Sequence, residues 1–271
     1  MIKFGLILWL FCVSVFGSPM LLKEYKDENL TGWVMSQKYD GVRAIWNGKE
    51  LKTKNGNTIK VPSDFILSLP NFALDGELWS GVGEFEFIAS TVLDEKPNLI
   101  AWQKIKYMVF DAPTFNGNLK ERMANLDQFL HKNPSEFIIP IRQIKIRDNS
   151  HAFAFLDEIV SIGGEGVVVR DPNAKYESGR SNKILKLKKW RDSECKISAI
   201  NSGKGKFKGA MGSVDCIDIF NGVKFKIGSG FSDEIRQNPP KIGTIITYKF
   251  ANLTKNSKPR FPVFLRIKRT E

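Results

Sequence analysis

Five short motifs between residues 38 and 188 carry side chains that could take part in chemistry. A lysine beside a turn can act as an amine nucleophile once it loses its proton, carboxylates can bind a divalent cation, and an aromatic ring can stack on a base. Two lysines two residues apart on a strand point the same way and can hold phosphates. In chain order these are the components of a nucleotidyl transfer. The motifs are Lys38-Tyr-Asp-Gly-Val-Arg43, Leu74-Asp-Gly-Glu-Leu78, Val109-Phe-Asp111, Glu165-Gly-Val-Val-Val-Arg170 and Leu185-Lys-Leu-Lys188.

Each motif has an ordinary structural explanation when it is taken alone. Asp75-Gly76 could be a surface turn that presents its acids to solvent, and Glu165 could face water. Lys186 and Lys188 could lie on a solvated strand face, which is the usual position of such residues. The order of all five along one stretch of chain is what favours a catalytic site over these separate explanations.

The motif series resembles that of the covalent nucleotidyltransferase superfamily, which contains ATP-dependent DNA ligases, RNA ligases and mRNA capping enzymes. Residues 203–230 and 259–268 resemble the oligonucleotide-binding domain of minimal ATP-dependent DNA ligases, of the exported bacterial kind. The resemblance covers residues 22–270 and implies an α+β fold. Residues 18–190 would form an adenylation domain of antiparallel sheets and helices, and residues 191–271 an all-β oligonucleotide-binding-fold barrel. An RNA ligase or a capping enzyme is the alternative within the superfamily, and a secreted DNA-binding module without activity is the alternative outside it.

The resemblance implies a role for each motif. Lys38 would attack the α-phosphate of ATP to form a lysyl-AMP, which passes to the 5′-phosphate of a nick in double-stranded DNA before the 3′-hydroxyl seals it. Phe110 would stack on adenine, and Glu77 would bind the ribose. Glu165 and Glu77 would hold the divalent cation, Mg²⁺ or Mn²⁺. The remaining nucleotide contacts would be Arg43, Arg180, Lys186, Lys188, Arg266 and Lys268, and the DNA contacts Lys54, Arg170, Lys204, Lys206 and Lys208.

Three positions depart from the family pattern. Lys54 stands where relatives often have arginine. Lysine keeps the positive charge but cannot form the bidentate hydrogen bonds that a guanidinium makes to a 5′-phosphate. Gln37 stands where many have glutamate, and Lys268 where they often have arginine. None of these changes removes an expected catalytic group.

The charge of the chain is concentrated in its last third. The 271 residues carry a formal net charge of +12, which indicates nucleic acid, an anionic membrane surface or an anionic substrate as partner. Residues 191–271 hold 16 Lys and Arg against 7 Asp and Glu, a net charge of +9. With 42% hydrophobic residues, including 20 Phe and 6 Trp, disorder along the whole chain is excluded. A nearly neutral core followed by a basic β-region is typical of an enzyme with a nucleic-acid clamp.

The first 17 residues have the pattern of a secretory signal peptide. A lysine at position 3 precedes an uncharged run over residues 4–16, and Val15 and Gly17 are small enough for a cleavage site. We therefore expect export, to the periplasm or beyond, and a monomer without stable membrane association after cleavage. Cys195 and Cys216 would remain. The sequence favours two buried thiols, although adjacent barrel strands could also place the pair in reach of a disulfide.

Periodicity predicts the elements that position these motifs. Residues 33–46 predict a hairpin that turns at Asp40-Gly41. Apolar residues spaced four, three and four apart predict a helix over 119–132, and a second helix is expected over 152–162, stopped by Gly163-Gly164. Residues 167–169 predict a buried strand. Five short strands are expected over 196–200, 213–220, 223–227, 244–250 and 261–267, without a long helix among them.

Overall fold

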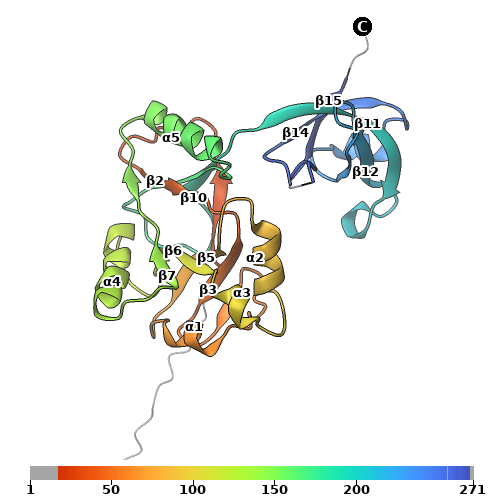
Figure 1. The fold of residues 1–271 in the computed structure, drawn as a ribbon. Helices are drawn as coiled ribbons and strands as arrows, with labels where there is room; N and C mark the ends of the chain where they lie inside the picture. Colours follow the sequence, from red (N-terminus) through yellow and green to blue (C-terminus); the bar gives the residue numbers. More distant parts are fainter. Residues whose placement is uncertain (1–17, 255, 269–271) are drawn as a thin grey trace, which may run out of the picture.

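The computed structural model describes residues 18–254 and 256–268. Within them the strands form three five-stranded sheets, two before residue 188 and one after it (Figure 1). The signal-peptide prediction for residues 1–17 lies outside the described residues. The mixture of antiparallel sheets and helices confirms the predicted α+β class.

The first sheet carries the chain segments that hold the candidate lysines. Its strands, in spatial order, are β1 (Met20–Glu24), β10 (Gly179–Leu187), β9 (Val167–Arg170), β2 (Val34–Gln37) and β8 (Ile144–Lys145). All its pairs are antiparallel except β1 with β10. The central strand β9 is buried along its whole length, as the Val-Val-Val run predicted. Because β2 and β10 both pair with β9, the residues that follow them meet beside the start of β9.

The second sheet has the order β4 (Leu51–Thr53), β3 (Val42–Trp46), β5 (Leu74–Trp79), β6 (Lys106–Asp111) and β7 (Ile138–Pro140), with only β6 and β7 parallel. The helices before residue 188 are α1 (Ser63–Leu67), α2 (Phe85–Val92), α3 (Leu99–Trp102), α4 (Leu119–Lys132) and α5 (Asn149–Ser161). Helices α2 and α4 pack against this second sheet, whereas α5 packs against β9 of the first. No helix in the described part of the chain is long and apolar enough to cross a bilayer.

Local capping explains where the two longest helices begin. In α4 the Asn118 side chain accepts the backbone N–H of Glu121, and the Glu121 carboxylate accepts that of Asn118, so the helix begins where its apolar spacing predicted. In α5 the Asp148 carboxylate accepts the backbone N–H of His151. That helix therefore begins at Asn149, three residues earlier than predicted, because Asp148 supplies the N-cap.

The predicted hairpin at Asp40-Gly41 is wrong. Strands β2 and β3 form, but β2 pairs with β8 and β9 while β3 pairs with β4 and β5, so the chain crosses from one sheet to the other. A Cβ at Gly41 would collide with the carbonyl oxygen of Leu78 on β5, so the glycine serves a close crossing and not a two-residue turn. The crossing carries Lys38 and Asp40.

The alternative explanation of Asp75-Gly76 as a surface turn is also wrong. Both residues lie inside β5, and Asp75 is fully buried against Arg43. A Cβ on Gly76 would come within 2.6 Å of the Tyr107 ring on the neighbouring strand. The Asp-Gly pair is therefore explained by an ion pair and by close strand packing. The dipeptide alone does not distinguish this arrangement from a turn.

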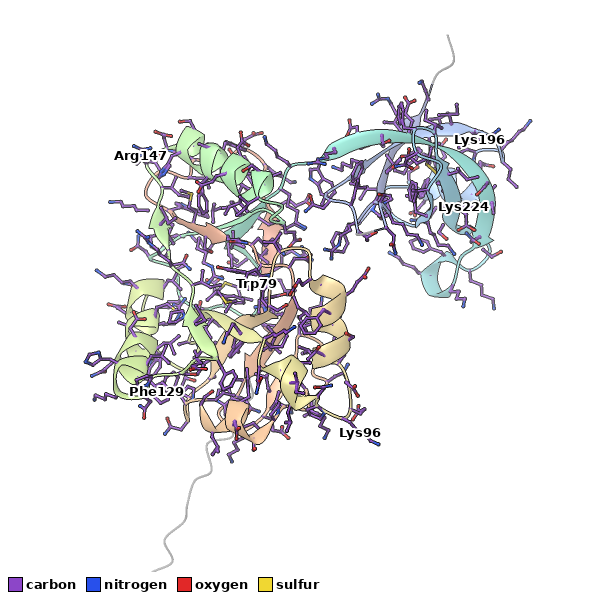
Figure 2. All side chains as sticks on the ribbon, in the orientation of Figure 1. Trp79, Lys96, Phe129, Arg147, Lys196 and Lys224 are labelled. Atoms are coloured by element: carbon purple, nitrogen blue, oxygen red, sulfur yellow. A yellow bond between two sulfur atoms is a disulfide. The ribbon has the colours of Figure 1, made fainter. Side chains whose placement is uncertain are left out.

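The third sheet is the expected small β-barrel. Its order is β13 (Lys224–Ile227), β12 (Met211–Asp218), β11 (Arg191–Ser202), β14 (Ile245–Phe250) and β15 (Val263–Ile267), and a bridge between Ser229 and Val263 joins its two edges. It also holds a 3₁₀ turn (Gly205–Phe207) and the short helix α6 (Asp233–Gln237). All five predicted strands are present. Figure 2 shows two of its exposed lysines, Lys196 and Lys224, on the outer surface.

A disulfide joins Cys195 on β11 to Cys216 on β12, with Cα atoms 5.6 Å apart. The expectation of two free thiols is therefore wrong. The cysteines are not directly opposite, since Cys216 faces Ile197 across the strand pair and Cys195 faces Asp218. Both are fully buried in the barrel core.

Candidate active site

Two lysines converge on one buried carboxylate. Lys38 follows β2, Glu165 precedes β9 and Lys188 follows β10, so the sheet brings all three together. The Lys38 Nζ donates to Glu165 Oε2 and the Lys188 Nζ to Glu165 Oε1, each at 2.5 Å. The Lys38 backbone N–H donates to the Gly166 carbonyl at 2.8 Å, which fixes the start of the crossing segment.

The charges of this triad control its protonation. Burial acts to raise the pKa of Glu165, but the two ammonium groups outweigh it and hold that pKa below its usual range. Burial lowers the pKa of Lys188, against the attraction of Glu165. The Glu165 carboxylate is therefore ionised, and it accepts a hydrogen bond from each of the two lysines.

A cavity beside Lys38 has the lining expected of a nucleotide pocket. It is walled by apolar side chains from the first sheet and by polar groups from both sheets. Its lining residues are Leu22, Ser36, Gln37, Lys38, Tyr39, Arg43, Glu77, Phe110, Ile141, Val168, Arg170 and Ile184. Five of the predicted site residues, Lys38, Arg43, Glu77, Phe110 and Arg170, therefore share one cavity.

Arg43 and Arg170 hold the Phe110 ring. The guanidinium carbon of Arg43 lies 5.3 Å from the ring centroid and that of Arg170 lies 4.8 Å from it. Arg170 also donates to the Phe110 carbonyl at 2.9 Å. Arg170, which the sequence predicts as a DNA contact, is 6% exposed and lines the same cavity as Phe110.

Glu77 lies on β5 beside the same lysine. Its Oε1 accepts the Gly41 backbone N–H at 3.2 Å. Burial raises the pKa of Glu77 to about 7, and the nearby Lys38 only partly opposes this. Glu77 is thus ready to be either a neutral hydrogen-bonding group or an ionised ligand near neutral pH, unlike the ionised Glu165.

The β-barrel contributes residues that the sequence reading did not single out. Arg260, on the loop between β14 and β15, forms an ion pair with Asp40 and has its guanidinium carbon 4.8 Å from the Phe85 ring centroid. Phe261 lies beside Lys188, whose Nζ is 5.3 Å from its ring centroid. Arg260 and Asn252 line a second cavity together with Lys38, Asp40, Glu165 and Trp79, the last labelled in Figure 2.

The sequence carries a signal for Arg260, because residues 259–268 resemble the oligonucleotide-binding domain of minimal ligases and contain Arg260 as well as Arg266 and Lys268. In the structure Lys268 forms an ion pair with Glu194 at 2.6 Å, and Arg266 is exposed on β15 opposite Thr247. Neither lines the two cavities beside Lys38.

The other predicted contacts lie outside the two cavities. Lys186 is 3.4 Å from Glu24 and lines a separate surface cavity with Tyr25, Phe153 and Trp190. Arg180 is exposed and donates to the Leu22 carbonyl at 3.3 Å. The expected DNA contacts Lys54, Lys204, Lys206 and Lys208 are all exposed, the last three in the β11–β12 connection.

Two family models match this chain. Residues 19–188 match the model of the ATP dependent DNA ligase domain, and residues 202–268 match the DNA ligase OB-like domain. The chain belongs to the ATP-dependent DNA ligases. Among curated relatives of this ligase, the DNA ligase of Haemophilus influenzae is 45% identical over 271 residues, covering 98% of this chain and all of that protein.

Solved structures agree with the assignment. A Lig E DNA ligase is 39% identical and covers 93% of this chain and 99% of its own, with a TM-score of 0.86. The adenylated DNA ligase of Chlorella virus is 24% identical over 94% of this chain, with a TM-score of 0.56, and shares the fold. The ligase described here is therefore of the minimal type, an adenylation core followed by one OB-like domain.

Proposed function

We propose that this ligase seals nicks in double-stranded DNA with ATP, and that Lys38 is the residue that carries AMP. The observation that carries the proposal is the convergence of Lys38 and Lys188 on Glu165, next to the cavity that Lys38 shares with Arg43, Glu77 and Phe110. A lone lysine near a turn would not support it. A lysine positioned by its backbone, paired to an ionised carboxylate and flanked by a second cation supports attack on a phosphate.

The chemistry has three steps. The neutral Lys38 amine attacks the α-phosphorus of ATP, a P–N bond forms, the bond to pyrophosphate breaks, and the nitrogen gives up one proton to solvent. A 5′-phosphate oxygen of the nick then attacks the same phosphorus, the P–N bond breaks, and Lys38 takes up a proton as the DNA-adenylate forms. Finally the 3′-hydroxyl loses its proton to solvent and attacks the 5′-phosphate, and AMP leaves, so the two strands are joined. Lys188 stabilises negative charge on the phosphate oxygens, because it is half-buried and shares the Glu165 carboxylate with Lys38.

The pocket residues orient the nucleotide for the first step. Phe110 supplies a flat face for adenine, and the arginines that hold it limit its movement. Glu77, beside Lys38, hydrogen-bonds the ribose. Gln37 replaces the glutamate common in relatives, so the adenine edge is contacted by an amide in place of a carboxylate.

A divalent cation, Mg²⁺ or Mn²⁺, fits a site built from few protein ligands. Both Glu165 oxygens are held by ammonium groups, and the described residues contain no cluster of three or more side chains suited to a metal. One or two carboxylates with substrate phosphates and water are a common Mg²⁺ arrangement. Glu165 would hold the cation once a lysine releases one of its oxygens, with the ionised Glu77 as a second carboxylate. The cation would supply positive charge that favours the neutral amine and polarises the phosphate.

The OB-like domain places Arg260, and not Arg266 or Lys268, beside the nucleophile. Arg260 contacts Asp40 next to the nucleophile, whereas Arg266 and Lys268 lie away from the pocket. We propose that this domain turns during the cycle, so that Arg266 and Lys268 reach the pyrophosphate of ATP and the basic loop with Lys204, Lys206 and Lys208 contacts the DNA backbone. Arg180, Lys186 and Lys54 serve phosphates of the nucleotide or the nick from the exposed surface.

We also propose that the protein is an exported monomer, with its first 17 residues removed and its domains meeting near residue 190. The disulfide between Cys195 and Cys216 supports an oxidising compartment. Repair or processing of DNA outside the cytoplasm, and not replication alone, would then be its role. Fractionation of cells that make the full chain tests this: recovery only from the cytoplasm would contradict export.

The activity is tested with a labelled nicked duplex. The purified chain without residues 1–17 is incubated with Mg²⁺ and either ATP or GTP, on a DNA nick or on RNA ends. Sealing of the DNA nick with ATP, lost in Lys38→Ala and retained in Lys189→Ala, supports the proposal. Lys189 is the matched control because it is a half-exposed lysine paired with Asp157, away from both cavities. Joining of RNA ends only, or use of GTP in preference to ATP, would contradict it.

A further inference from the structure

Five charged side chains lie packed behind the Phe110 ring. Asp75 and Asp111 are opposite each other on β5 and β6, and are 0% and 1% exposed. Two of the three arginines between and around them, Arg43 and Arg170, touch the ring, as described above. The third, Arg122, comes from helix α4 and lines neither cavity beside Lys38. The cluster is fully buried except for part of Arg43, and it carries three positive charges against two negative ones.

Arg122 is the most fully bonded member of this cluster. Its Nε and Nη2 donate to the two oxygens of Asp111 at 2.7 and 2.9 Å. Its Nη1 donates to the carbonyls of Gly117 and Ala174 at 2.8 and 3.0 Å. One guanidinium therefore ties the end of β6, which carries Phe110, to helix α4 and to the loop that follows β9.

The Arg122 fork determines where Arg170 can go. Because Arg122 occupies both Asp111 oxygens, Arg170 stays 3.5 Å from Asp111 and is free to donate to the Phe110 carbonyl and stack on the Phe110 ring. The Nε of Arg170 is buried without a hydrogen-bond partner. Without Arg122, Asp111 would be a buried carboxylate whose nearest cation is Arg170, and the attraction would draw Arg170 away from Phe110.

Tyr176 holds Asp75 in the way that Arg122 holds Asp111. Its hydroxyl donates to Asp75 Oδ2 at 2.7 Å, while Asp75 accepts two bonds from Arg43 at 2.6 and 2.9 Å. Tyr176 lies on the loop that Arg122 anchors through Ala174. The two acids are thus each held from outside the pocket, and each in turn positions one arginine against Phe110.

We propose that Arg122 and Tyr176 are positioning residues for nucleotide binding, acting through Asp111 and Asp75 to fix the two arginines that hold Phe110. The inference rests on the proposed function, because it takes Phe110 as the surface that receives adenine. Both residues act on ground-state binding of ATP. Their loss therefore raises the KM for ATP and leaves the rate of Lys38 adenylation at saturating ATP close to that of the wild type.

The test compares Arg122→Met with Lys120→Met, an exposed lysine on the same helix as matched control. Adenylation from labelled ATP is followed at increasing ATP concentration, with thermal unfolding measured alongside. We expect Arg122→Met to raise KM about 5- to 50-fold, the range of a weakened base stack, with kcat changed less than about threefold. A purely structural residue would lower Tm and the amount of active enzyme but leave the KM of the folded enzyme unchanged, and that result would overturn the inference.

A double-mutant cycle shows whether the effect passes through the ring. In a Phe110→Ala background, Arg122→Met should raise KM by less than about twofold further, because the ring it positions is already gone. Equal effects in both backgrounds would overturn the route through Phe110.

Tyr176→Phe removes one oxygen and keeps the ring, so it tests the same network if Arg122→Met fails to fold. We expect a KM increase of about 2- to 10-fold, the value of one hydrogen bond, and an unchanged KM would overturn the inference. Wild-type enzyme that forms no adduct would instead contradict the proposed function itself. The two failures are thereby distinguished.

Discussion

The buried Glu77 should make the stability of the ligase depend on pH in a direction opposite to that of most carboxylates. Burial raises its pKa from 4.5 to about 7. Between these values the native state binds a proton that the unfolded state does not. The free energy of unfolding therefore falls as the pH rises from 4.5 to 7, and the difference in pKa corresponds to about 3 kcal/mol.

Glu77→Gln tests this directly, because glutamine is neutral at every pH and can still accept the Gly41 N–H. Urea unfolding is measured for both proteins between pH 4.5 and 8, with Glu136→Gln as the exposed control. The free energy of unfolding of the variant should rise relative to that of the wild type by up to about 3 kcal/mol as the pH rises to 7. Glu165, whose pKa is lowered, is present in both proteins, so its contribution cancels in the difference. A difference constant to within about 0.5 kcal/mol would refute the assignment of a raised pKa to Glu77.

Three further changes test other parts of the account. Arg260→Ala removes the ion pair with Asp40 and should slow adenylation of the enzyme by ATP about tenfold or more. The same change should leave the sealing of a DNA that already carries AMP unaffected. Equal slowing of both steps would argue against a role of Arg260 in adenylation. Phe110→Ala should weaken ATP binding by about 1–3 kcal/mol, the value of a base stack, measured as the KM of adenylation, and an unchanged KM would remove Phe110 from the pocket. Cys195→Ser removes the disulfide between cysteines 21 positions apart and should lower the free energy of unfolding by about 3 kcal/mol. The measurement is thermal unfolding of the variant and of the wild type, each with and without reductant. A wild-type protein whose unfolding is insensitive to reductant would contradict a stabilising disulfide.

Local signals predicted the elements well. Helix α4 begins and ends as its spacing indicated, since Asn118 and Glu121 form a capping box next to the apolar stripe. The five barrel strands follow alternation bounded by glycine turns, and all five are present. These elements are determined by residues close to each other in the sequence, so one sequence is enough to find them.

The errors occurred where distant partners decide the structure. Asp-Gly normally marks a turn, but Asp75 is held inside a strand by Arg43, 32 residues away, and by Tyr176, 101 residues away. Strands β2 and β3 each have better partners in separate sheets than they have in each other. Turn-forming dipeptides in the local sequence do not indicate which strands pair.

The side chains that converge on Glu165 were easier to predict than their surroundings. Lys38, Glu165 and Lys188 were found because their motifs combine side-chain type with fixed spacing, and the sheet brings them together. The Arg260 contact with Asp40 spans 220 residues, and Arg122 lies on a helix where it looks like an ordinary surface arginine. Such positions require the fold, because nothing in the local sequence distinguishes a buried arginine fork from an exposed one.

The most direct test of the account is to find where AMP becomes attached. The wild-type ligase is incubated with ATP and a divalent cation, digested, and the adducted peptide identified by mass spectrometry. The account predicts one AMP per chain, on Lys38, that disappears when nicked DNA is added and is absent in Lys38→Ala. An AMP adduct on another residue, or one that persists in Lys38→Ala, would contradict the central claim.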